Sequence, residues 1–192
     1  MTEDSSDNLR KFLESDDSAM ILLGLSLAKG SAKASNVVLG MVLGLYLFHN
    51  DKDIRSLAKT TFGKSASSDL RKTVKNYWQA EYRTTVWIWD GWMQKMVVAL
   101  EGLGINTTYL LVRGLIMISH EITRSNSEEV EDARGKILEM LEKRDMSVSY
   151  SIIRSLLKNL LDANFRSDWW QRLNRENVEI ASKILKQLDS YN

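Results

Sequence analysis

Apolar residues return at steps of three and four along most of the chain, which is the period of an amphipathic helix. The clearest case is the segment 50–63, where an acidic turn at Asp51 precedes a helix whose first apolar position is Ile54. Weaker copies of this helix begin at Ser127 and at Glu176. A helix that recurs every few tens of residues is typical of stacked helical repeats, in which each unit buries its apolar side against its neighbours.

Capping residues and short polar turns divide the chain into eight to ten predicted helices. Runs of alternating Val, Ile, Thr and Tyr are scarce, so strands are not expected. The predicted helices cover residues 8–15, 19–29, 37–49, 54–64, 70 onwards, 86–100, 107–121, 128–143, 149–162 and 168–189. Because turns of a few residues favour antiparallel neighbours, the sequence predicts an all-α fold, a short right-handed stack of antiparallel helical hairpins.

The expected organisation is a single domain over residues 1–192, since no linker is long or polar enough to divide it. Residues 1–15 are expected to cap the N-terminal end of the stack, and 69–104 to form aromatic-rich helices. The repeat units are expected at 19–66, 107–143 and 149–189.

The most apolar run, residues 37–48, is shorter than the roughly 20 residues that cross a bilayer. Lys29 and Lys33 separate it from the apolar residues before it, so a buried helix is favoured over a membrane hairpin. Gly40 and Gly44 lie on one face of this helix, and we expect another backbone to approach closely there.

The segment from Asp51 to Ala58 combines an acidic turn, an apolar residue with an arginine beside it and a small residue four positions later. In these features it resembles the second helix of HEAT repeats. The resemblance covers residues 19–66, while Val130 and Val178 share the helix periodicity without the adjacent arginine. It implies an α-α superhelix, and such arrays usually serve as interaction scaffolds whose inner surface holds a protein or a nucleic acid.

Charge is unevenly distributed, although the net charge is only +1. Residues 1–17 carry six acids against two bases, and 128–145 carry seven acids against four bases. Residues 52–83 carry three acids against eight bases: Lys52, Arg55, Lys59, Lys64, Arg71, Lys72, Lys75 and Arg83. This basic stripe indicates either a solvated helix face or a surface for an acidic partner, including a nucleic-acid backbone.

Tryptophans gather beside the basic stripe and again near the C-terminus: Trp78, Trp87, Trp89 and Trp92, then Trp169 and Trp170. Filling the core is the plainer explanation, since an aromatic side chain buries roughly 150–250 Å². Two tryptophans one or two positions apart, such as Trp87 and Trp89, cannot both face the same side of a helix. Some of them are therefore expected at a surface, where tryptophan anchors protein interfaces or stacks on bases.

The leading functional hypothesis is a non-catalytic protein–protein interaction module or scaffold. Its predicted binding residues are the six tryptophans together with Arg55, Arg71, Lys72, Lys75 and Arg83. The expected partner is a protein, with a nucleic acid as the alternative; neither a membrane, a metal nor a cofactor is expected.

The alternative draws on a superficial resemblance of Trp87-Ile88-Trp89-Asp90 to HEAT-like alkylpurine DNA glycosylases, which use tryptophans and an acid in a basic groove. This resemblance implies that Asp90 stabilises positive charge on the sugar and that Trp87 or Trp89 contacts the lesion. Arg83 and Lys95 would hold phosphates. A net charge near zero argues against an enzyme dedicated to DNA.

Other site chemistry is limited by the residues that the chain lacks. It has no cysteine, which excludes disulfides, thiolate zinc sites and catalytic thiols. The two histidines, His49 and His120, fall near the ends of matching helices, where as cations or donors they would suit the helix dipole. The acidic start has no positive and apolar segments of a secretory signal, so a cytoplasmic location is expected.

Overall fold

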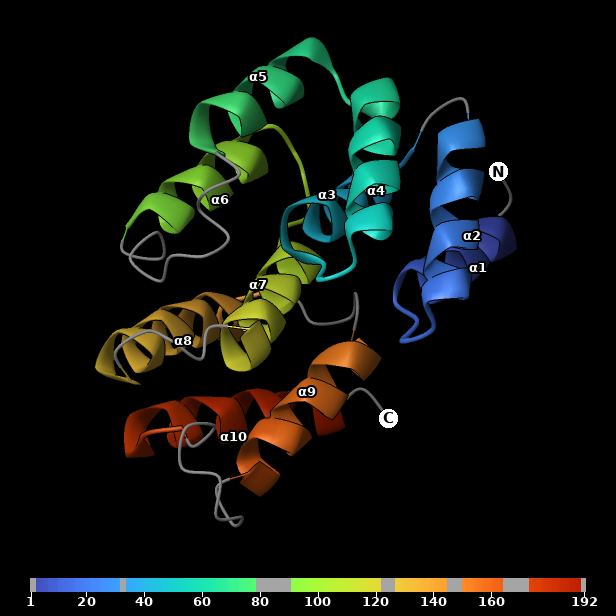
Figure 1. The fold of residues 1–192 in the computed structure, drawn as a ribbon. Coiled ribbons are helices and arrows are strands. Elements are labelled where there is room, and N and C mark those ends of the chain that lie inside the picture. The colour runs from blue at the N-terminus through green and yellow to red at the C-terminus, as the bar shows by residue number, and fades with distance from the viewer. Residues whose placement is uncertain are drawn as a thin grey trace.

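The computed structural model describes residues 3–31, 34–78, 91–121, 127–144, 150–163 and 173–190. These ranges contain ten helices and no strand (Figure 1). The helices are α1 (Glu3–Leu13), α2 (Ser18–Gly30), α3 (Asn36–Phe48), α4 (Lys52–Ser65), α5 (Ser68–Tyr77), α6 (Trp92–Gly102), α7 (Thr108–Glu121), α8 (Ser127–Glu142), α9 (Tyr150–Ala163) and α10 (Arg175–Asp189). The prediction of an all-α fold with eight to ten helices is confirmed for this part of the chain.

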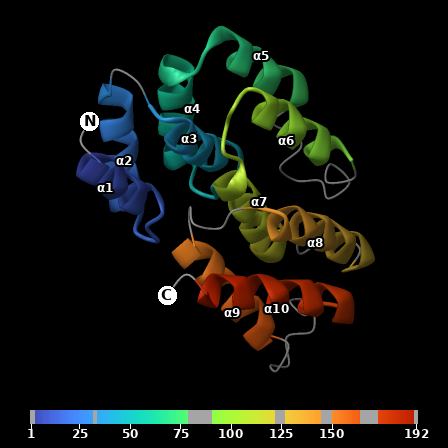
Figure 2. The same cartoon turned by 180° about the vertical axis from the view of Figure 1, so that it is seen from behind.

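Successive helices pair as hairpins: α1 with α2, α3 with α4, α5 with α6, α7 with α8 and α9 with α10. Four of these hairpins stack in series. Helices α1, α3, α7 and α9 follow one another in one layer, while α2 packs on α4 and α8 packs on α10 in a second layer. The α5–α6 hairpin stands beside this stack, as Figures 1 and 2 show. The predicted stack of helical hairpins is therefore present.

The first hairpin joins the predicted N-terminal cap to the helix that follows it. Residues 1–15 are expected to cap the stack, and α1 packs along α2 as the other half of a hairpin. Leu9 and Leu13 of α1 are buried in the same continuous core as α2 and α3. The range 19–66 thus holds one helix of the first hairpin and both helices of the second.

The stack is centred on α3, which is buried along almost its whole length. It meets α7 through two glycines, as their spacing predicts. A Cβ added to Gly40 would lie 1.9 Å from the backbone oxygen of Asn106, and one added to Gly44 would lie 3.0 Å from a ring carbon of Tyr109. Only residues without side chains allow the two helices to approach this closely.

Side-chain oxygens cap the N-termini of several helices and so fix where these helices begin. The capping residues are Asp17 for α2, Ser35 for α3, Asp51 for α4, Ser67 for α5 and Asn174 for α10. Asp51 accepts from two backbone N–H groups, of Asp53 and Ile54, and these bonds lower the pKa of its carboxyl. The acidic turn that marks this helix in the sequence is its N-cap.

Two helices begin later than predicted. Gly91 has a φ of 76° and immediately precedes α6, so no right-handed helix passes through it and the start predicted at residue 86 is wrong. The helix predicted from residue 168 is also wrong at its start. Leu173 and Asn174 are not helical, and the Asn174 side chain accepts from the backbone N–H of Asn177 at 2.8 Å as the cap of α10.

Candidate functional site

Most of the tryptophans proposed as anchors lie outside the described residues. This applies to Trp87, Trp89, Trp169 and Trp170, and also to Arg83 and Asp90. Trp92 is the first residue of α6. Trp78, at the end of α5, is half-buried and meets the ring of Phe48 edge-on, with centroids 5.2 Å apart. Trp78 therefore packs against the core at the end of α3.

Arg55 and Arg71, two of the predicted binding residues, bond to the backbone at the end of the preceding helix. Arg55 donates to the carbonyl oxygens of His49, at 2.8 Å, and Asn50. Arg71 donates to those of Gly63, at 3.0 Å, and Ala66, at 2.7 Å. Cations at a helix C-terminus satisfy its free carbonyls and its dipole. Each arginine stands four positions after an N-cap, a spacing that the sequence already displays.

The other described bases of the stripe are exposed on α4 and α5. The exposed residues are Lys52, Lys59, Lys64, Lys72 and Lys75, and Lys95 on α6 is exposed as well. Lys64 also donates to the carbonyl oxygen of Lys29 at 2.9 Å, which places its ammonium group at the C-terminus of α2. The exposed acids Asp53 and Asp69 lie on the same two helices.

A second feature of the surface is an apolar stripe on α2, formed by Met20, Leu23 and Leu27. These side chains are 37%, 46% and 48% exposed, and their spacing of three and four places them on one face of the helix. The opposite face carries buried residues: Ile21, Leu25 and Ala28. Helix α2 lies at one end of the stack (Figures 1 and 2), so no further hairpin of the described chain covers this stripe.

A cavity of about 340 Å³ opens where the end of α1 meets α7 and α9. Its lining is Glu14, Asp16, Arg113, Ile116, Ser151, Ile152, Ser155, Leu156 and Asn159. The Ser151 hydroxyl donates to the carboxylate of Glu14 at 3.4 Å, although the two residues are 137 positions apart. The first and last hairpins of the stack therefore approach each other beside α7, and the cavity lies between them.

Arg113 is the buried polar residue of this cavity, with 9% of its surface exposed. Its side chain bonds to the phenol of Tyr109, and its buried Nε has no hydrogen-bond partner in the described part of the chain. The Tyr109 hydroxyl donates to the carbonyl oxygen of Leu13 at 2.8 Å. Burial raises the pKa of Tyr109 well above its usual value, so the phenol stays neutral.

Sequence reasoning missed Arg113, although one signal could have found it. Residues 109–118 are apolar except for Arg113 and Gly114, and a lone charge in such a run is either paired or functional. The other cavity residues carry no common signal, because they come from two helices, α7 and α9, and from the turn between α1 and α2, which are distant in sequence.

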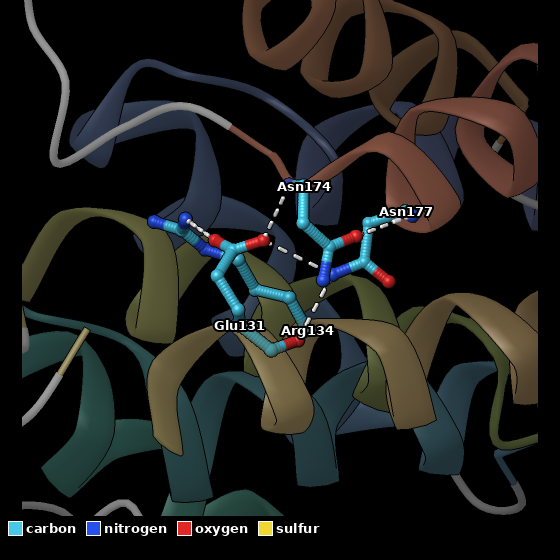
Figure 3. Close-up of polar contacts among 4 residues, drawn as sticks. All are labelled: Glu131, Arg134, Asn174 and Asn177. Atoms are coloured by element: carbon cyan, nitrogen blue, oxygen red, sulfur yellow. Dashed lines mark hydrogen bonds and ion pairs between the residues drawn. The ribbon is translucent and has the colours of Figure 1, made fainter. Parts of the chain in front are cut away.

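A second buried arginine, Arg134 on α8, has the partner that Arg113 lacks. Arg134 bonds to one carboxylate oxygen of Glu131. The other oxygen accepts from the backbone N–H of Asn174, at 2.8 Å, and from the Asn177 amide, at 3.1 Å (Figure 3). The same amide donates to the Glu131 carbonyl oxygen at 2.9 Å. This network joins α8 to the start of α10, with Arg134 and Asn177 buried, so it stabilises the stack.

His49 is not a cation at the end of its helix. His49 follows α3 and is buried; burial first, and then the nearby charge of Arg113, lower its pKa to about 4. It is neutral at pH 7, and its Nδ1 accepts a hydrogen bond from the backbone N–H of Asp51 at 3.0 Å. Of the two roles expected at this helix end, cation or hydrogen-bond donor, that of a cation is wrong for His49, because desolvation outweighs the dipole. His120 lies on α7, and its side chain is outside the described residues.

The fold and the site define an all-α stack of helical hairpins with an apolar terminal face and a polar cavity. Among the described residues, no group of three or more His, Asp or Glu is placed to hold a metal ion. None of the described helices is long and apolar enough to span a bilayer. Comparison of the chain with protein-family models, curated proteins and solved structures finds no match.

Proposed function

We propose that the protein is a non-catalytic interaction module that binds a protein partner through the apolar stripe of α2. The observation that carries this proposal is the exposure of Met20, Leu23 and Leu27 on the terminal hairpin. Terminal units of helical stacks normally have a polar outer face, which keeps them apart in solution. A contiguous exposed apolar face rimmed by charge is typical of an interaction site.

Charges at the two ends of the stripe define the partner. Asp17 precedes α2 and is exposed, whereas Lys29 and the ammonium group of Lys64 lie at its other end. An amphipathic segment with a basic residue at one end and an acidic residue at the other would satisfy both ends. The resemblance to HEAT repeats supports the same scaffold role. The tryptophans outside the described residues remain proposed anchors, and a cytoplasmic location remains part of the proposal.

The test compares Leu23→Glu with Val98→Glu. Val98 on α6 is an apolar residue with 67% of its surface exposed, outside the stripe, so both substitutions add the same charge to an exposed helix position. Proteins recovered by quantitative affinity purification would be purified and their affinities for each variant measured by titration. A partner that binds the wild type and the Val98 variant equally, and the Leu23 variant about tenfold or more weakly, supports the proposal. Equal binding of all partners to both variants would overturn it.

The exposed lysines of α4 and α5 favour nucleic-acid binding as a second candidate. A gel-shift assay with duplex DNA at low salt tests it, because phosphate contacts weaken steeply with salt. A salt-sensitive shift that is lost in the double variant Lys72→Glu, Lys75→Glu would support this candidate. The absence of any shift at low salt would exclude it.

A further inference from the structure

Arg113 and Arg134 are buried, Arg10 and Arg154 are partly exposed, and all four have a buried Nε. Three of them bond to a carboxylate through a terminal nitrogen, with Asp7, Glu131 and Asp189 as the partners. Arg113 takes part in none of the ion pairs found among the described residues. Among the described residues, its positive charge is therefore buried without a bound counter-charge, which is costly for a folded protein.

The free space next to Arg113 is large enough for a ligand. A volume of about 340 Å³ lies at the lower end of the range of small-molecule sites, roughly 300–1,000 Å³. Polar groups that could orient a ligand line it, namely the hydroxyl of Ser155 and the amide of Asn159. Ile116, Ile152 and Leu156 add an apolar wall.

The charges around the cavity determine which kind of charged ligand fits it. Glu14 and Asp16 line it together with Arg113, and both carboxylates lie close enough to Tyr109 to raise the pKa of its phenol. A dianion such as phosphate would meet Arg113 but would be repelled by two carboxylates. A ligand that carries one negative and one positive charge matches the whole set, because a positive group beside the exposed Asp16 would replace repulsion with attraction.

We propose that this cavity binds an α-amino acid with an apolar side chain. The carboxylate of the ligand bonds to the guanidinium of Arg113, which presents two donors in the geometry of a carboxylate. The ammonium group faces Asp16 and Glu14 at the rim. The side chain lies against Ile116, Ile152 and Leu156. This site is separate from the apolar stripe of α2, so the proposal does not depend on the proposed protein partner.

The test is titration calorimetry of the full chain with L-leucine at millimolar concentration. Leucinamide has no carboxylate and N-acetyl-leucine has no ammonium group, so each should bind about tenfold to a hundredfold more weakly than leucine. The dipeptide Leu-Leu distinguishes a peptide terminus from a free amino acid as the source of this chemistry. Inorganic phosphate serves as the dianion. No binding of leucine or Leu-Leu, or tighter binding of phosphate than of either, would overturn the proposal.

Variants locate the binding in the cavity. Arg113→Gln should weaken the binding of leucine by about tenfold or more, while Arg10→Gln, at an arginine that has its own carboxylate, should leave it unchanged. Because Arg113 is buried, its substitution can also destabilise the fold. A second variant, Ser155→Trp, is therefore tested beside it, since it fills the cavity from an exposed position on α9. If the folded Ser155→Trp protein binds leucine with wild-type affinity, the ligand lies elsewhere and the proposal is overturned, even if the Arg113 variant does not fold.

Discussion

The hydroxyl of Tyr109 on α7 donates a 2.8 Å hydrogen bond to the carbonyl oxygen of Leu13 at the end of α1. The two residues are 96 positions apart, and both are buried. This bond joins the first hairpin to the third hairpin of the stack. It also presents the phenol oxygen to Arg113, so the same side chain supports the fold and the wall of the cavity.

Replacing Tyr109 with Phe should reduce the free energy of unfolding by about 1–3 kcal/mol, because it leaves a buried carbonyl oxygen without its donor. Urea denaturation followed by circular dichroism measures the change. Tyr46→Phe is the matched control: Tyr46 is partly buried, and none of the hydrogen bonds found among the described residues involves its hydroxyl. Its substitution should change the stability by less than about 0.5 kcal/mol. Equal effects of the two variants would contradict the importance of the bond to Leu13.

Gly40 and Gly63 should respond in opposite directions to the same substitution. A Cβ on Gly40 would lie 1.9 Å from the backbone oxygen of Asn106, so Gly40→Ala must push α3 and α7 apart and should cost about 3 kcal/mol. A Cβ on Gly63 of α4 meets nothing within 4 Å, so Gly63→Ala should raise the stability by about 0.5–1 kcal/mol through helix propensity. Thermal or urea unfolding distinguishes the two. A stable Gly40→Ala protein would show that the helices are not in close contact.

The network of Figure 3 predicts a strong dependence on Glu131. Arg134 is 2% exposed, and removing its carboxylate partner with Glu131→Ala leaves a buried charge unpaired, at a cost of about 3 kcal/mol or more. Asp132→Ala on the same helix removes a surface pair with Lys136, in which Asp132 is 64% exposed. That change should cost less than about 0.5 kcal/mol. Similar urea midpoints for the two variants would contradict the structural role of the network.

The buried His49 predicts a loss of stability in mild acid. The pKa of His49 is about 4 in the folded protein, whereas an imidazole in the unfolded chain has its ordinary value of 6.5. Between these pH values the unfolded chain therefore binds more protons than the folded one. The free energy of unfolding is therefore largest above pH 6.5 and should fall by up to about 3 kcal/mol on the way to pH 4. Urea denaturation across this range measures the slope. His49→Gln should flatten it, and an unchanged slope in that variant would assign the acid sensitivity to other groups.

Most of the helices and one contact between them could be predicted from the sequence. Asp51 and Ser67 mark helix starts through local chemistry, since a capping side chain bonds within three residues of itself. The four-residue spacing of Gly40 and Gly44 likewise predicted a close helix contact, because the period of a helix fixes which side chains share a face. Such features depend on neighbours in the chain and are visible in one sequence.

The cavity could not be predicted in the same way. Its charged residues, Glu14, Asp16 and Arg113, come from distant parts of the chain, and only the order of stacking brings them together. The later start of α6 was missed for a different reason. In the sequence Gly91 resembles a glycine that a helix tolerates, and only its positive φ shows that α6 begins after it. The roles assigned to the tryptophans outside the described residues stay predictions.

The direct contact between α3 and α7 leaves the α5–α6 hairpin out of the line of stacked helices. Because the second and fourth hairpins of the chain meet without it, the order of the stacked helices does not depend on this hairpin. Residues such as Leu70 and Val97 still bury it against the common core, so changes on its exposed side, for example at Val98, can vary the surface of the protein while the surfaces on either side keep their spacing.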